Sequence, residues 1–250
     1  NATYNVVFQF VGYTKHVETI TVQNKDVQID VVMQPEDVTL PSVIVTTDGR
    51  DPAYAIIEAA QDKRKYYLKK MSAYSAQVYI KGTMRMDEMP EDLPFGVILN
   101  DTELDSSLLG LLFVTESVAN FHYKAPDNFK EEMLASKVAG WSQGFSWNRA
   151  NDVIFNFYEN DIALGGVAER EFVSPIAWDA KLFYEYQLVG TIVTDGRQIK
   201  KIKVIPKKDH YPCFHWHIYI AKDTCHIESV DLSVTKDANI EWVDTIHFDQ

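Results

Sequence analysis

Two histidines on one predicted strand have the residue type and spacing of metal ligands. His215 and His217 are two positions apart, so both rings point to the same face of a strand. The expected neighbouring strand could add Asp231 or Glu228 to a site for zinc or a similar ion. No Cys/His spacing of a closed zinc site accompanies them. The alternative is a core strand in which Trp216 faces the interior and the histidines line the other face, so we expect no metal site.

A second pattern with catalytic spacing is Gly140-Trp141-Ser142-Gln143-Gly144, which has the form G-x-S-x-G of a nucleophile elbow. The elbow works because a sharp strand-to-helix turn lifts its serine above a parallel sheet. A parallel sheet needs crossover helices, but only one convincing helix pattern precedes Ser142, and the run Phe145-Ser146-Trp147-Asn148 directly after the pattern is not an obvious helix. We expect an aromatic loop here and a protein that is not an enzyme, with a serine hydrolase as the remote alternative.

Charge, spacing and missing motifs disfavour several other kinds of site. Acidic residues gather between positions 86 and 105, but they lack the tight alternation and the glycine of a calcium loop, so we expect a solvated loop. The formal net charge of −12 disfavours nucleic acid as a partner. No phosphate loop or dinucleotide fingerprint is present, so we expect no cofactor.

The first third of the chain predicts strands followed by a helix. Residues 4–10, 17–22 and 27–33 carry the apolar–polar alternation of strands. Asp51-Pro52 is typical of a helix start, and the helix is expected over residues 51–72. Its predicted apolar side consists of Ile56, Ile57, Ala60, Tyr67, Leu68 and Met71. Its predicted charged side consists of Asp62, Arg64, Lys65 and Lys69.

The rest of the chain predicts antiparallel strands. Short connections and turn residues such as Asp195-Gly196 join the strands expected after residue 181, which makes them a meander. The predicted strands are 72–82, 111–123, 131–138, 182–193, 200–205, 214–220, 226–234 and 239–248, with a short helix at 152–158. We expect an α+β, mainly β protein in which a partial immunoglobulin-like β-sandwich precedes an antiparallel sheet packed on one main helix. The expected domains are residues 1–47 and 48–250.

Two further expectations concern the cysteines and the chain ends. Cys213 and Cys225 flank the predicted hairpin, roughly 20 Å apart at about 3.3 Å per residue, which predicts two free thiols. The chain begins and ends at predicted strands, so we expect it to be a piece of a longer polypeptide.

The first 47 residues resemble a known module. The runs Phe10-Val11-Gly12-Tyr13, Val31-Val32-Met33 and Leu40-Pro41-Ser42-Val43-Ile44-Val45 are similar to the second half of a carboxypeptidase-regulatory-like domain. Such domains are seven-stranded immunoglobulin-type sandwiches that often precede outer-membrane barrels in Bacteroidota, and they carry no peptidase site. The resemblance implies a sandwich that is truncated here.

The remainder resembles an uncharacterised family that follows such modules. The matching runs are Asp51-Pro52-Ala53-Tyr54, Asn156-Phe157-Tyr158-Glu159-Asn160, Ser174-Pro175, Lys203-Val204-Ile205-Pro206-Lys207 and Val243-Asp244-Thr245. Members of this family are longer and end in a predicted outer-membrane β-barrel. The resemblance implies a periplasmic location, and membrane association through a C-terminal barrel that is absent from this chain.

We therefore expect a non-catalytic binding or scaffolding segment whose partner is an envelope protein or a hydrophobic ligand. The order of helix and meander is also similar to lipoprotein-carrier proteins of the outer-membrane sorting pathway, in which a curved half-barrel holds acyl chains. That alternative, a carrier of a lipid or another hydrophobic ligand, predicts an apolar lining made of Val78, Ile80, Tyr184, Tyr186, Leu188, Trp216 and Ile218.

Overall fold

The fold is mainly β with several antiparallel sheets, as the sequence predicts. The computed structural model describes residues 2–23, 26–36, 49–86, 110–126, 128–140, 148–164, 168, 170–194, 196–235 and 245–249. Its helices are α1 (Ala53–Lys70), α2 (Ala150–Val153) and α3 (Ala180–Phe183). Among the described residues, none of the helices has the length and apolar character needed to cross a membrane.

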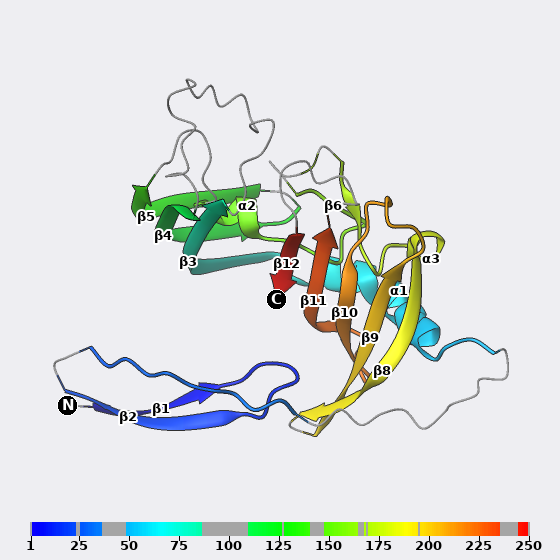
Figure 1. The fold of residues 1–250 in the computed structure, drawn as a ribbon, viewed down its shortest axis with the longest axis horizontal. Helices are drawn as coiled ribbons and strands as arrows, with labels where there is room; N and C mark the ends of the chain where they lie inside the picture. Colours follow the sequence, from blue (N-terminus) through cyan, green and yellow to red (C-terminus); the bar gives the residue numbers. More distant parts are fainter. Residues whose placement is uncertain are drawn as a thin grey trace.

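Five C-terminal strands form the largest sheet, with the order β12-β11-β10-β9-β8. They are β8 (Tyr184–Thr194), β9 (Arg197–Pro206), β10 (His215–Ala221), β11 (Ile227–Thr235) and β12 (Thr245–Asp249). Every neighbouring pair is antiparallel, which confirms the predicted meander. Figure 1 shows the strands side by side, from yellow β8 to red β12.

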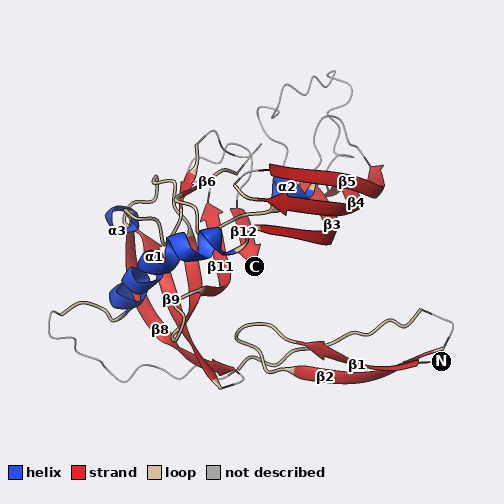
Figure 2. Cartoon of the chain, turned by 180° about the vertical axis from the view of Figure 1, so that it is seen from behind, coloured by secondary structure: helices blue, strands red, loops and turns tan. Residues whose placement is uncertain are grey.

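Helix α1 lies across one face of this sheet (Figure 2). Ile57 on α1 is fully buried, and the Tyr54 ring meets the Tyr186 ring edge-on at 5.4 Å. The segment between α2 and α3 completes the cover with Phe157 and Phe172, whose rings pack on Phe214, the residue just before β10. Burial of this apolar surface is the main stabilising contribution to the fold. The inward positions of the sheet are therefore occupied by packed core.

Asp51 ties the start of α1 to the edge of the sheet. Its Oδ1 accepts the backbone N–H of Ala53 at 2.9 Å, as the predicted cap requires, and also that of Leu188 on β8 at 2.9 Å. One carboxylate thus satisfies a free amide of the helix and an amide of an edge strand. This contact sets where the helix crosses the sheet.

Replacing this carboxylate should cost measurable stability. We expect Asp51→Ala to lower the free energy of unfolding by about 1–2 kcal/mol, because two backbone amides lose their acceptor. Urea unfolding followed by circular dichroism measures the change. The matched control is Asp62→Ala, an exposed residue on the same helix, which should stay within about 0.5 kcal/mol of the original protein. Equal effects for the two variants would contradict the role of Asp51.

A second sheet has the order β3-β4-β5, with β3 (Ala73–Met86), β4 (Gly110–Lys124) and β5 (Asn128–Gly140). The predicted strands from residue 72 to 138 are confirmed there. The side chain of Glu131 on β5 is 4% exposed, and its Oε1 accepts the backbone N–H of Ala150 at 2.8 Å. This buried carboxylate attaches α2 to the sheet. The predicted helix over 152–158 is wrong in extent, because α2 ends at Val153 and an extended Ile154 follows.

The N-terminal residues form a two-stranded antiparallel ribbon of β1 (Ala2–Phe8) and β2 (His16–Val22). The predicted strand over residues 27–33 is wrong, since residues 26–34 carry no strand. An alternating pattern becomes a strand only where a partner supplies ladder hydrogen bonds. Here that pairing is limited to a bridge at Tyr13 and Pro35. Between β6 (Asp161–Ile162) and β7 (Phe172–Val173) lies a further small pairing.

The loop between β1 and β2 packs on the outer face of the five-stranded sheet, because a β-bulge turns residues of β8 toward that face. The register shifts between Leu188 and Gly190, so residues beyond the bulge change face. Leu188 belongs to the core under α1, whereas Ile192 belongs to a small cluster on which Val11 packs. Thr194 Oγ1 also donates a hydrogen bond to Glu36 at 2.8 Å. The ribbon is thereby attached near the tips of β8 and β9 (Figure 1).

Candidate functional site

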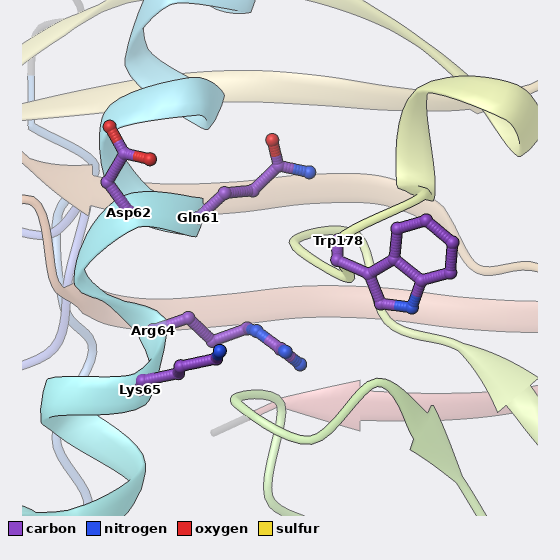
Figure 3. A pocket seen from close by; sticks show the side chains of 5 residues that line it. All are labelled: Gln61, Asp62, Arg64, Lys65 and Trp178. Carbon is purple, nitrogen blue, oxygen red and sulfur yellow. The ribbon is translucent and has the colours of Figure 1, made fainter.

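A groove beside α1 is the candidate site. It has a volume of about 360 Å³ and is lined by Gln61, Asp62, Arg64, Lys65 and Trp178. Figure 3 shows that Gln61, Arg64 and Lys65 extend from α1 toward the side where Trp178 lies, whereas Asp62 points away from it. The groove therefore places two cationic side chains and one amide opposite an indole ring.

Arg64 is buried, with 8% of its surface exposed, which corrects the prediction that it lies on the charged outer side of the helix. The reason is helical spacing, because Ala53, Ile57, Ala60 and Arg64 follow one another at three or four positions along one face. The guanidinium donates from Nη1 to the backbone oxygen of Tyr158 at 3.1 Å. No carboxylate of the described residues pairs with it. A buried cation without a counter-ion is costly.

The wall of the groove opposite α1, which carries Trp178, is fixed by hydrogen bonds that do not involve the indole. Gln61 Nε2 donates to the backbone oxygen of Ala177 at 2.5 Å, and the Trp178 backbone N–H donates to Asn160 Oδ1 at 3.3 Å. Nearby, Lys181 pairs with Glu58 at 2.5 Å and so joins the two walls a second time. The Trp178 side chain is nevertheless 71% exposed. The backbone is fixed while the large ring stays accessible, which is the arrangement of a preformed binding surface.

The predicted histidine site lies on the outer face of the five-stranded sheet. His217 Nδ1 is 3.5 Å from Asp231 Oδ2, and His247 Nε2 is 3.4 Å from Asp231 Oδ1. The carboxylate thus lies between two rings from neighbouring strands. In the part of the chain that is described, no three His, Cys, Asp or Glu side chains are arranged to hold a metal ion.

On the same face, the buried serines that the structure describes are not bonded to a histidine. Ser229 and Ser233 are 5% and 2% exposed, and neither hydroxyl has a hydrogen-bond partner among the described residues. Burial lowers the pKa of His217, Lys201 lowers it further, and Asp231 opposes the shift. A neutral imidazole can act as a base only where a hydroxyl donates to it. These serines are therefore not activated by His217 or His247.

Comparison with protein families identifies residues 56–250 as a match to a family of unknown function, DUF5686. The chain belongs to this family. No curated protein and no solved structure matches it. The match contains α1 from Ile56 onward, both larger sheets and the whole candidate groove, and it leaves the N-terminal ribbon outside. The groove is thus a feature of the DUF5686 region.

The residues predicted to line an apolar cavity are not brought together in the DUF5686 region. Tyr184, Tyr186, Leu188 and Ile218 belong to the filled core beneath α1. Val78 and Ile80 are half-buried on β3 in the other sheet.

Trp216 was expected to face the core, and this prediction is wrong. Its side chain is 55% exposed, and its φ of 89° takes the backbone out of the strand region at that residue. The regular alternation of side chains is lost where the backbone leaves that region. Two other predicted features, Ser142 with its loop and the acidic stretch 87–105, lie outside the described residues.

Sequence reasoning missed the groove because its two walls are far apart in the chain. Arg64 and Trp178 are separated by more than a hundred positions, and each looks ordinary in its local context. Two features of the sequence could have indicated it. Arg64 stands at the apolar spacing of its helix, and Trp178 follows shortly after Ser174-Pro175. A cation on the inner stripe of an amphipathic helix is a departure that indicates a partner or a ligand.

The two cysteines of the DUF5686 region are both free thiols, which confirms the prediction. Cys213 is fully buried, and burial raises the pKa of its thiol to about 11. At pH 8 only about one molecule in a thousand carries the Cys213 thiolate. Cys225 is half-buried in the turn that follows β10. The two thiols therefore differ strongly in access and in the availability of the thiolate.

Alkylation should separate the two cysteines. We expect iodoacetamide at pH 8 to add one group to the folded protein, at Cys225, because only that sulfur is accessible. Intact-protein mass spectrometry counts the adducts, and urea should expose Cys213 for a second addition. As the control, Cys225→Ser should take up no group until the chain is unfolded. Rapid addition of two groups to the folded protein would contradict the burial of Cys213.

Proposed function

We propose that this chain is a non-catalytic binding and scaffolding segment that works in the periplasm as part of an outer-membrane β-barrel protein. The single observation that carries the binding role is the groove beside α1. It places a buried guanidinium, paired with no carboxylate of the described residues, opposite an exposed indole, and both groups recognise ligands without transforming them. The periplasmic role rests on the resemblance of the sequence to segments that precede outer-membrane barrels. The expected partner is a component of the cell envelope.

Two alternatives receive less support from the described residues. A carrier of lipids needs an apolar hollow, but four of the seven expected lining residues are packed in the core. A hydrolase needs a nucleophile bonded to a base; Ser142 lies outside the described residues, and within them Ser229 and Ser233 make no such bond. The binding role therefore remains the one that the groove favours.

Location is tested in cells that produce the protein from its native gene. We expect an antibody raised against this chain to detect it in the outer-membrane fraction. Added protease should leave it intact in whole cells and cleave it once the outer membrane is made permeable. The control is a periplasmic protein of known location in the same cells. Recovery of the chain in the cytoplasmic fraction would overturn the proposal.

The absence of catalysis is tested on the purified 250-residue chain. We expect no turnover of ester, phosphate or glycoside substrates above the rate in buffer. The matched variant is Ser142→Ala, which removes the serine of the elbow pattern. Turnover that this variant abolishes would replace the binding role with a hydrolase.

A further inference from the structure

Arg64 is the group in the groove whose surroundings are incomplete. Its guanidinium carries five N–H donors in a planar fork, and in the described residues one hydrogen bond, from Nη1 to Tyr158, is made. The side chain is more than nine-tenths buried, yet it lines the open groove. A desolvated fork of this kind binds a carboxylate or phosphate through paired hydrogen bonds. Lys65, on the same wall, adds a second positive charge.

We propose that this groove binds an acidic saccharide, with its carboxylate on Arg64 and Lys65 and one face of its sugar ring on Trp178. This inference rests on the binding role proposed above and names the class of ligand. The anion supplies the counter-charge that no described residue gives the buried guanidinium. The indole, 71% exposed, supplies a flat apolar surface for the C–H face of a ring.

Size favours a ligand of one or two rings. The groove holds about 360 Å³, near the lower end of the range for small-molecule sites. An extended peptide or another protein would need a longer surface than these five side chains provide. A bare phosphate ion would occupy the cationic wall and leave the indole uncovered. A ring that carries an acid group spans both walls.

Gln61 favours a ligand with hydroxyl groups. Its Nε2 is committed to Ala177 on the opposite wall, and its Oε1 accepts no hydrogen bond from the described residues. That oxygen is therefore free to accept a hydroxyl of the ligand. An apolar ring would bury Oε1 without a donor, which is unfavourable. A saccharide satisfies the amide, the guanidinium and the indole together.

The proposal is tested by saturation-transfer NMR on the 250-residue chain with glucuronate, glucose, inorganic phosphate and a short peptide that ends in a free carboxylate. We expect glucuronate to bind with a dissociation constant on the order of 1 mM, as is ordinary for a small polar ligand. Glucose should bind about tenfold more weakly because it lacks the acid group. The transferred signal should be strongest on the ring protons of one sugar face.

Variants locate the binding. Trp178→Ala and Lys65→Gln change exposed side chains, so both should fold and each should weaken glucuronate binding about tenfold. The matched control is Leu182→Ala, which removes an exposed apolar side chain four positions after Trp178 and should bind normally. Arg64→Lys keeps the charge and loses the fork, and should weaken binding by about tenfold or more. Its melting temperature is measured alongside, so that loss of fold is not read as loss of binding.

Three outcomes would overturn the proposal that the groove binds an acidic saccharide. Phosphate binding as tightly as glucuronate, with no effect of Trp178→Ala, would leave an anion site without a ring. Preference for the peptide would change the ligand to a terminal carboxylate and would leave the binding role intact. If none of the four probes binds, the acidic saccharide is excluded as the ligand. The location of the chain in the cell is decided by the separate fractionation experiment.

Discussion

Replacing Tyr184 with Phe should lower the free energy of unfolding by about 3 kcal/mol, although only one oxygen atom is lost. The Tyr184 side chain is fully buried, and its hydroxyl donates to the backbone oxygen of Val173 at 2.5 Å. The same hydroxyl accepts the backbone N–H of Phe214 at 2.9 Å. Without it, a buried carbonyl and a buried amide both lose their partner. Burial also raises the pKa of Tyr184 well above its usual range, so the hydroxyl stays protonated.

The neighbouring Tyr186 provides the matched control. It is 3% exposed, and its hydroxyl makes one hydrogen bond to the described residues, donating to the backbone oxygen of Pro175 at 2.7 Å. Tyr186→Phe should therefore cost about 1 kcal/mol. Thermal unfolding should show a melting temperature roughly 6–12 °C lower for Tyr184→Phe, and a clearly smaller shift for the control. Equal shifts in melting temperature would mean that the two hydrogen bonds of Tyr184, which join β7 to the residue before β10, do not stabilise the fold.

Truncating Ile57 should have an effect of similar size through packing. Ile57 is fully buried between α1 and the five-stranded sheet, within the main core cluster. Ile57→Ala removes three carbon atoms and leaves a cavity that the rigid sheet cannot close. We expect a loss of about 3 kcal/mol in the free energy of unfolding, measured by urea unfolding with fluorescence detection.

The control for this packing effect is Met71→Ala at the end of the same helix. The apolar pattern places Met71 on the same side of the helix as Ile57, but its side chain is 54% exposed at the C-cap. We expect a change of less than about 0.5 kcal/mol. A large loss for Met71→Ala would show that α1 packs along its whole predicted apolar side, against the arrangement described above.

Much of the fold was predictable because its signals are local. Alternating residues and short turns predicted the meander of β8 to β12, and Asp51-Pro52 predicted the start of α1. The free state of Cys213 and Cys225 followed from their positions at opposite ends of one strand. In each case the backbone geometry of one or two neighbouring elements is enough to decide the result.

The remaining features depend on contacts between distant segments. Trp216 fitted the alternation of a core strand, but a left-handed backbone at that residue leaves it exposed. The sequence by itself determined the class of fold, the order of the strands and the main helix, since residue periodicity expresses which faces must be buried. Only the tertiary structure decided that Arg64 is buried with no carboxylate of the described residues beside it and that Trp178 lies opposite it, because the pairing of groups more than a hundred residues apart is set by how α1 crosses the sheet.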